Sequence, residues 1–155
     1  MDLLVNLYDM GAAPLPAEES LSVRRALSPD RDKVLAFVRA HWPGWESECA
    51  CAFGGQPPCC FLALRGGELV GFACYDATAR GYFGPIGVRP GAGGGGLGRR
   101  LLYAALDGMR EAGYGYAVVG WMDSALGFYQ HSIKCFPIPE SQPRNTIYQR
   151  LSLWT

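Results

Sequence analysis

One stretch of sequence decides the fold of this chain: Val88-Arg89-Pro90-Gly91-Ala92-Gly93-Gly94-Gly95-Gly96-Leu97-Gly98-Arg99-Arg100-Leu101. Six of the eight residues from Gly91 to Gly98 are glycine. Each ordered glycine costs roughly 0.5–1 kcal/mol relative to alanine, so such a run is expected where bare backbone is needed. A predicted strand precedes the loop and a predicted helix follows it, and a helix N-terminus offers unpaired N–H groups with a partial positive charge. The stretch therefore predicts a loop that binds phosphate oxygens, rather than a flexible glycine linker.

Two familiar phosphate-binding patterns compete for this loop and match it poorly. Gly93 to Gly98 has the span of a Walker loop, but Arg99-Arg100 replaces the Lys-Ser/Thr pair that reaches phosphate and magnesium. A dinucleotide fingerprint through Gly93, Gly95 and Gly98 requires an acidic residue about 20 residues later. The following strand ends instead in Val118-Val119-Gly120.

On both sides of the loop, the spacing of apolar residues predicts a mixed order of helices and strands. Leu101, Ala105 and Met109 form one row of a helix from about Leu97 to Ala112, which Gly113 ends. The apolar run Tyr116–Trp121 predicts a strand buried on both faces. The other predicted elements are strands at 23–27, 60–64, 69–75, 82–88, 135–138 and 147–153, and helices after Ser28, at 45–53 and at 124–131. A right-handed crossover joins the strands on either side of the glycine-loop helix.

Segments that contain glycine and proline mark the expected domain boundaries. Residues 1–22 are interpreted as a loosely held lead-in, in which Leu3 to Leu7 could add a short strand or helical turn. Residues 23–155 are expected to form one domain. Gly84-Pro85 interrupts the predicted strand 82–88, which indicates a bulge or a sheet edge.

Composition narrows the class of protein. The chain has 155 residues, with 14 basic and 14 acidic side chains, so net charge makes no case for nucleic acid or an anionic membrane surface. No apolar run reaches the roughly 18 residues that span a bilayer. The N-terminus lacks a basic region and a cleavage-like site, so no signal peptide is predicted and a cytoplasmic location is expected.

The six cysteines are interpreted as reduced thiols that serve as small apolar residues. A zinc site would need pairs spaced as C-x-x-C. Cys49-Ala50-Cys51 and Cys59-Cys60 do not match that spacing, so no metal is expected.

Two segments together resemble the GNAT superfamily of N-acetyltransferases. Val88-x-Pro90 followed by Gly94-x-Gly96-x-Gly98-x-x-Leu101 resembles its motif A, and Ala125-Leu126-Gly127-Phe128-Tyr129 resembles its second motif. With Tyr82-Phe83-Gly84-Pro85, the pattern looks like a bacterial subgroup of small, mostly uncharacterised acetyltransferases. The resemblance runs from Val23 to Leu153. It implies an α/β (α+β) fold with a mixed, mostly antiparallel sheet of six to seven strands, splayed central strands and about four flanking helices.

The resemblance implies acetyl-coenzyme A as co-substrate. Its pantetheine arm would pass through a gap opened by Gly84-Pro85, and its diphosphate would lie on the glycine loop. The implied cofactor-binding residues are Ile86, Gly87, Val88, Gly93, Gly94, Gly95, Gly96, Leu97, Gly98, Arg99 and Phe128. The family usually carries Gln or Arg where Gly93 stands, so Arg99 or Arg89 is expected to compensate in part.

Tyr129 is the predicted general acid. A tyrosine with a pKa of about 10 is protonated at neutral pH and can supply the proton that a departing thiolate needs. The alternative interpretation of Tyr129 is a core aromatic residue on a helix face. For the general base, the candidates are Glu48, Asp76, Asp123 and His131, or a water relay, or an amine that arrives neutral. His131 follows Tyr129 by two positions, so it is expected at the surface.

The acceptor pocket is expected between the first helices and the strand hairpins, with Trp42, Trp45, Glu48, Tyr75 and Trp121 as its candidate lining. The leading hypothesis is an N-acetyltransferase that moves an acetyl group to an amine of a small molecule. The alternative is a catalytically idle module that binds or senses coenzyme A. Acetylation of a protein N-terminus or lysine lacks a supporting signature, and dimerisation is common in such folds. The sequence does not identify the acceptor.

Overall fold

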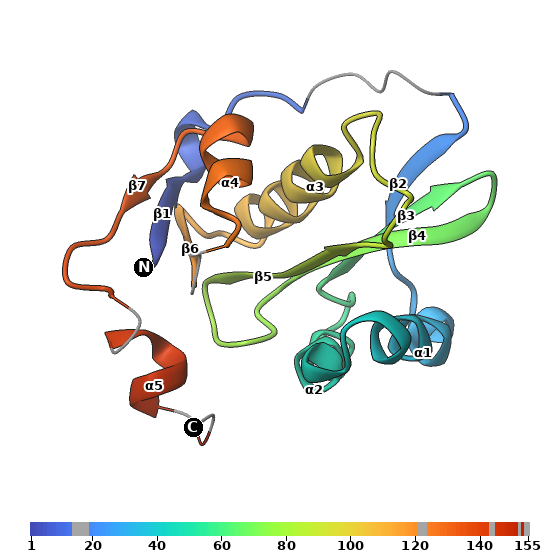
Figure 1. Ribbon diagram of the computed structural model, residues 1–155, viewed down its shortest axis with the longest axis horizontal. Helices are drawn as coiled ribbons and strands as arrows, with labels where there is room; N and C mark the ends of the chain where they lie inside the picture. The colour runs from blue at the N-terminus through green and yellow to red at the C-terminus, as the bar shows by residue number, and fades with distance from the viewer. Residues whose placement is uncertain (14–18, 121–123, 143–144, 152, 154–155) are drawn as a thin grey trace.

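The computed structural model describes residues 1–13, 19–120, 124–142, 145–151 and 153 (Figure 1). Its strands are β1 (Leu3–Asn6), β2 (Leu21–Arg25), β3 (Cys60–Arg65), β4 (Glu68–Tyr75), β5 (Tyr82–Val88), β6 (Tyr116–Val119) and β7 (Phe136–Pro137). Its α-helices are α1 (Arg31–His41), α2 (Glu46–Ala52), α3 (Leu97–Glu111), α4 (Leu126–Ser132) and α5 (Ile147–Leu151). Short 3-10 turns at Leu7–Asp9, Ser28–Asp30 and Pro43–Trp45 complete the described elements.

The strands form one sheet in the order β2-β3-β4-β5-β6-β1-β7. Among the described strands, only β5 and β6 pair in parallel, and α3 makes the crossover between them. The predicted mixed, mostly antiparallel sheet is confirmed, with five α-helices described where about four were expected.

Two apolar cores lie on opposite faces of the sheet. On one face, Leu101, Leu102 and Leu106 of α3 are fully buried against the strands, as the predicted helical rows require. On the other face, Val34 and Val38 of α1 pack over the sheet together with α2. Figure 1 shows α3 and α4 on the first face and α1 and α2 on the second.

The N-terminal residues belong to the sheet. β1 lies between β6 and β7, and Leu3 pairs with Val119 on one side and with Pro137 on the other. Leu3, Val5 and Leu7 are at most 1% exposed. The short strand allowed for Leu3 to Leu7 is therefore confirmed as β1, but its description as loosely held is wrong, because the alternating apolar side chains belong to the core.

The predicted strand 147–153 is wrong, because Ile147–Leu151 forms the helix α5. The sheet position next to β6 is already taken by β1, and β7 extends that edge. A helix signal was present in the sequence, since Thr146-x-x-Gln149 matches a capping-box pattern. The backbone N–H groups of Gln149 and Arg150 donate to Thr146 O, at 3.1 Å each.

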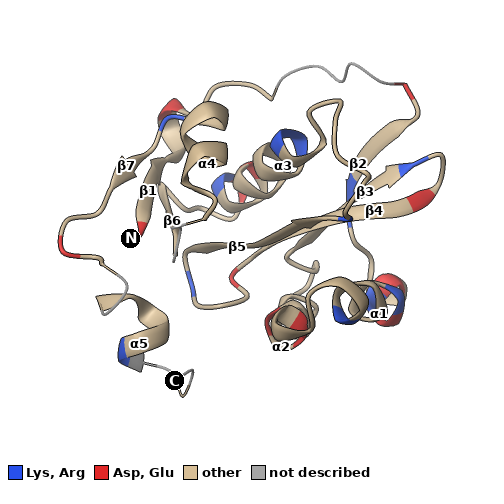
Figure 2. Cartoon of the chain, viewed as in Figure 1, with Lys and Arg blue, Asp and Glu red and all other residues tan. Residues whose placement is uncertain are grey.

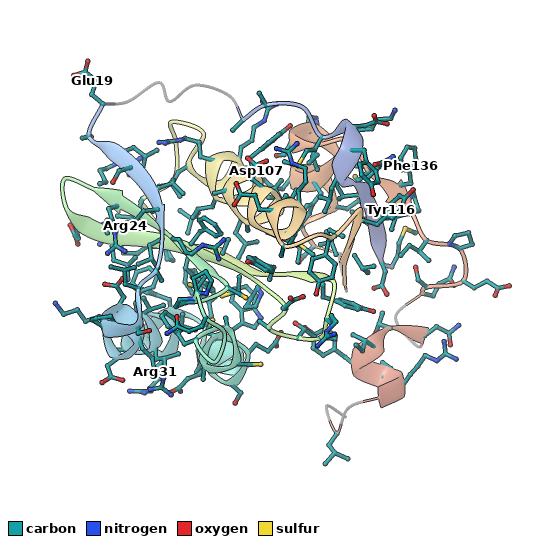
Figure 3. The ribbon with its side chains drawn as sticks, turned by 180° about the vertical axis from the view of Figure 1, so that it is seen from behind. Glu19, Arg24, Arg31, Asp107, Tyr116 and Phe136 are labelled. Atoms are coloured by element: carbon teal, nitrogen blue, oxygen red, sulfur yellow. The ribbon has the colours of Figure 1, made fainter. Side chains whose placement is uncertain are left out.

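The prediction that the strand 116–121 is buried on both faces is also wrong. β6 buries Ala117 and Val119, but Tyr116 is 54% exposed. Figure 3 shows Tyr116 and Phe136 on one flank of the molecule. The Tyr8 ring packs edge-on against Tyr116 at 6.1 Å, which covers part of this flank.

Charged residues of both signs are interspersed over the described elements, as Figure 2 shows for α1 and α3. Within the described part of the chain, none of the helices is long and apolar enough to cross a membrane. Cys49, Cys60 and Cys74 are fully buried within the core under α1 and α2, whereas Cys51 is exposed. Hydrogen bonds with the thiols of Cys49 and Cys60, together with burial, favour the protonated form and raise the pKa of the Cys74 thiol well above its usual value.

Candidate functional site

The site begins where β5 and β6 separate. Among the residues that the structure describes, the two strands pair in parallel only at Tyr82 with Val118 and Phe83 with Val119, and β6 ends at Val119. Beyond Phe83, β5 continues against β4 alone, with a register shift opposite Gly84-Pro85. The predicted interruption of this strand therefore coincides with the opening between the two central strands.

A cavity of about 530 Å³ lies at this opening. The residues that line it come from α2, β5, β6, α4, α5 and their connections. They are Trp45, Glu48, Thr78, Tyr82, Phe83, Gly84, Pro85, Ile86, Val119, Gly120, Ser124, Ala125, Tyr129 and Tyr148. Most of this lining is apolar or aromatic, as is usual for pockets that bind small molecules.

The residues of β5 point to two faces. Ile86 lines the cavity, and Val88 lies on the same side of the strand, near α3. Gly87 is different, because a Cβ built there would lie 2.7 Å from the Trp42 ring and 2.8 Å from the Phe72 ring. The lack of a side chain at Gly87 thus lets Trp42 pack directly on the strand, while its backbone stays in the ladder with β4.

The glycine loop presents bare backbone beside α3. Gly94, Gly95 and Gly96 have φ angles of 105°, 65° and 71°, a region in which side chains are strained. A Cβ at Gly93, Gly94 or Gly96 would meet no atom within 4 Å, so the loop faces open space. Buried Ala92 anchors its start, because Arg65 Nη1 donates a 2.7 Å hydrogen bond to Ala92 O.

The N-terminus of α3 follows this loop directly. Gly98 and Arg99 lie in the first turn, where backbone N–H groups lack an acceptor within the helix. A Cβ at Gly98 would lie 3.3 Å from Phe128 Cε2, so Gly98 also allows α4 to approach α3 closely. This packing role was not anticipated from the sequence, which indicated only the backbone amide.

The two arginines expected to compensate for Gly93 differ in their surroundings. Arg89 Nη1 is paired with Glu68 Oε1 at 2.5 Å, across β4 and β5. Arg99 is exposed, and its guanidinium lies 5.8 Å from the centre of the Tyr103 ring. Arg99 is therefore the better placed of the two to meet a phosphate at the start of α3.

Tyr129 lies on α4 and is 4% exposed, and it is part of the cavity lining. Its ring packs edge-on against Phe83 at 6.1 Å and against Phe128 at 5.0 Å. Burial raises the pKa of Tyr129 above its usual value. The hydroxyl consequently stays protonated across the neutral range, as a proton donor must.

Two of the residues predicted for an acceptor pocket, Trp45 and Glu48, line the cavity. Trp42 instead packs against Trp45, with ring centres 5.6 Å apart. Tyr75 lies outside the cavity lining: its ring packs beside Gly108 of α3, and its hydroxyl accepts a 3.0 Å hydrogen bond from Arg25. Trp121 lies outside the described residues.

Two residues of this wall were missed by the sequence analysis. Thr78 and Tyr148 both donate hydrogen bonds to Glu48 Oε2, the latter at 3.1 Å. Thr78 had no distinguishing signal, and the capping-box pattern at Thr146 was the one sign that Tyr148 would lie on a helix. Burial, reinforced by the Glu48 charge, raises the pKa of Tyr148 to about 12.

Of the three described candidates for the general base, Glu48, Asp76 and His131, Glu48 is the one that lines the cavity. Asp76 accepts hydrogen bonds from the Tyr114 hydroxyl at 2.8 and 2.9 Å and from Gly81 N, which ties it to the β4–β5 turn. His131 is exposed, as expected, with Nδ1 2.7 Å from Gly127 O. Asp123 lies outside the described residues.

The open backbone of the glycine loop, the start of α3 and the gap beside Ile86 fit a long ligand that ends in a diphosphate. The glycines of the loop leave their backbone amides uncovered, and the cavity offers a mostly apolar wall for the other end of such a ligand. Among the described residues, no group of three or more His, Cys, Asp or Glu side chains could hold a metal ion.

The chain was compared with known proteins. The profile of the acetyltransferase (GNAT) family matches residues 21–133. No curated protein is significantly similar to the chain.

Several solved structures share its fold. A GCN5-related N-acetyltransferase from Sphaerobacter thermophilus aligns with a TM-score of 0.66 and 19% identity, over 86% of this chain and 48% of that one. One from Kribbella flavida aligns at 0.65 and 21%, over 88% of this chain and 53% of that one. A GNAT family acetyltransferase from Brucella melitensis, in complex with acetyl-CoA, aligns at 0.58 and 17%, over 81% and 93%. The chain thus spans about half the length of the first two proteins, and at these identities the likeness is one of fold.

Proposed function

The chain belongs to the acetyltransferase (GNAT) family, and we propose that it moves the acetyl group of acetyl-CoA to an amine of a small molecule. The single observation that carries this proposal is the opening between β5 and β6, whose cavity is lined by Tyr129 and Ile86, with the glycine loop following the same strand β5. The acetyl-CoA complex of the Brucella relative supports the choice of co-substrate.

In this proposal, the first turn of α3 and the amides of Gly94 to Gly98 bind the diphosphate, with Arg99 adding positive charge. The backbone of Ile86, Gly87 and Val88 orients the pantetheine arm beside the cavity. The amine nitrogen attacks the thioester carbon, so a C–N bond forms as the C–S bond breaks. Tyr129 gives its proton to the departing thiolate, and the proton lost by the amine leaves through Glu48 or water.

The test has two parts that use the purified chain. Calorimetry with coenzyme A should give measurable binding heat, and an Arg99→Ala variant should bind more weakly because one positive charge is lost. Thiol release measured over a panel of amines should identify turnover. An absence of any heat with coenzyme A would contradict the proposal.

Turnover also separates the enzyme from the alternative of an idle coenzyme A sensor. Clear binding of coenzyme A with no thiol release for any amine would support the sensor. Mass spectrometry of the product, with an added mass of one acetyl group on the amine, would exclude simple thioester hydrolysis.

A further inference from the structure

Three polar side chains from distant parts of the chain meet at one end of the cavity. Glu48 comes from α2, Thr78 from the β4–β5 connection and Tyr148 from α5. Thr78 Oγ1 and the Tyr148 hydroxyl both donate to Glu48 Oε2, and these two hydroxyl oxygens are 3.3 Å apart. The three groups form one hydrogen-bonded unit, which we call the Glu48 triad.

The triad gives the cavity a fixed negative end. Among the described residues that line the cavity, Glu48 alone carries a charge. The hydroxyl groups of Thr78 and Tyr148 both donate to Oε2, and a carboxylate has about four acceptor positions, so Oε1 retains acceptor capacity. A carboxylate in an otherwise apolar pocket attracts a cation more strongly than it would in water.

The rest of the lining defines the body of the ligand. Trp45 and Tyr82 line the same cavity as the triad, together with the apolar residues Phe83, Ile86 and Val119. Aromatic faces favour cationic and apolar groups. The described cavity lining contains no lysine or arginine that could pair with a carboxylate on the ligand.

We propose that the Glu48 triad recognises the ammonium group of the acceptor, and that acceptors are small amines with an apolar or aromatic body and no acidic group. This inference rests on the proposed function, because it names the class of acceptor that the same site takes. Glu48 binds the cation. Thr78 and Tyr148 are positioning residues, because each acts by holding Oε2 and so orienting Oε1.

The test uses two ligands that differ in one group, 2-phenylethylamine and phenylalanine. Both have the same ring and amine, and phenylalanine adds a carboxylate. At neutral pH, we expect kcat/KM for 2-phenylethylamine to exceed that for phenylalanine by at least about 100-fold, the size of effect seen when a buried charge loses its partner. Quenching of the fluorescence of Trp45 and the other tryptophans measures amine binding independently of turnover.

Variants of the triad assign the effect to Glu48. Glu48→Gln should raise the Kd and KM for 2-phenylethylamine about 10- to 100-fold and leave the KM for acetyl-CoA unchanged. The matched control is Glu46→Gln on the same helix, whose carboxylate pairs with Arg39 at 2.6 Å outside the cavity. Tyr148→Phe and Thr78→Val should each raise the KM about 3- to 10-fold without lowering kcat, and they serve as the test should Glu48→Gln not fold.

Each result has a distinct meaning. Equal use of phenylalanine and 2-phenylethylamine, or an unchanged amine Kd in all three variants, would overturn this inference while turnover keeps the proposed function. If coenzyme A binds but no amine is acetylated, the proposed function fails, and the fluorescence titration still decides whether Glu48 holds the ammonium group.

Discussion

The two ends of the proposed site are built in different ways. The proposed cofactor end is one continuous stretch from Val88 to Arg99, which lies outside the cavity lining and would act mainly through its backbone. The acceptor end is assembled from Glu48, Thr78 and Tyr148, with a hydrogen bond that joins residues 100 positions apart. Backbone groups are the same at every position, so the first end depends on conformation. The second depends on three particular side chains that packing brings together, and this difference indicates where specificity resides.

The largest expected effect comes from Tyr129, which lines the cavity and is the proposed proton donor. Tyr129→Phe should lower kcat about 10²- to 10⁴-fold, because the departing thiolate loses its proton donor. The KM for acetyl-CoA should change little, since the ring contacts with Phe83 and Phe128 remain. Steady-state kinetics of thiol release measures both. Tyr116→Phe, on the exposed flank, is the matched control, and an unchanged kcat for Tyr129→Phe would make Tyr129 a core residue only.

A second comparison contrasts two glycines of the predicted cofactor site. Gly87→Ala should reduce the free energy of unfolding by about 1–3 kcal/mol, because its Cβ would lie 2.7 Å from the Trp42 ring. Gly93→Ala, with nothing within 4 Å of the added Cβ, should change it by less than about 0.5 kcal/mol. Urea unfolding followed by tryptophan fluorescence compares the two variants. Equal losses at both positions would show that Trp42 does not pack on β5 as described.

Coenzyme A binding at the proposed cofactor end can also be strengthened by adding a side chain. The family resemblance places Gln or Arg at position 93, and the space above Gly93 is open. Gly93→Gln should tighten coenzyme A binding about 2- to 10-fold, the value of one net hydrogen bond of about 0.5–1.5 kcal/mol. Calorimetry measures the change, with Gly93→Leu as the control of similar bulk. No gain for Gln over Leu would indicate that the diphosphate does not lie beside this position.

The smallest effect concerns alkaline pH, which acts on the acceptor end. Burial raises the pKa of Tyr148 to about 12, and it raises the pKa of Tyr82 as well. The unfolded chain therefore loses these protons first, starting near pH 10, so stability is fully present below that pH and falls as pH rises toward 12. Urea unfolding at pH 8 to 11 should show a shallower decline for Tyr148→Phe than for the wild type. Parallel declines would contradict the burial of Tyr148.

Much of the fold could be predicted from local patterns. The helical spacing of Leu101, Ala105 and Met109 predicted α3. The interruption at Gly84-Pro85 predicted the separation of β5 from β6. The failures have a common cause. Leu3 to Leu7 was allowed as a short strand but given no place in the sheet, and 147–153 was assigned to a strand. Each assignment depends on which sheet edge is free, and β1 itself occupies the place beside β6. Edge occupancy is a long-range property that a local pattern does not contain.

The sequence by itself determined the family and the candidate cofactor loop, because glycine spacing and the start of a helix are local features of one contiguous segment. Only the tertiary structure decided which predicted pocket residues share the cavity: it brought in Thr78 and Tyr148, and it left Tyr75 bound to Arg25. The physical reason is that a hydrogen bond between side chains 100 residues apart requires the packed sheet and helices to position both partners.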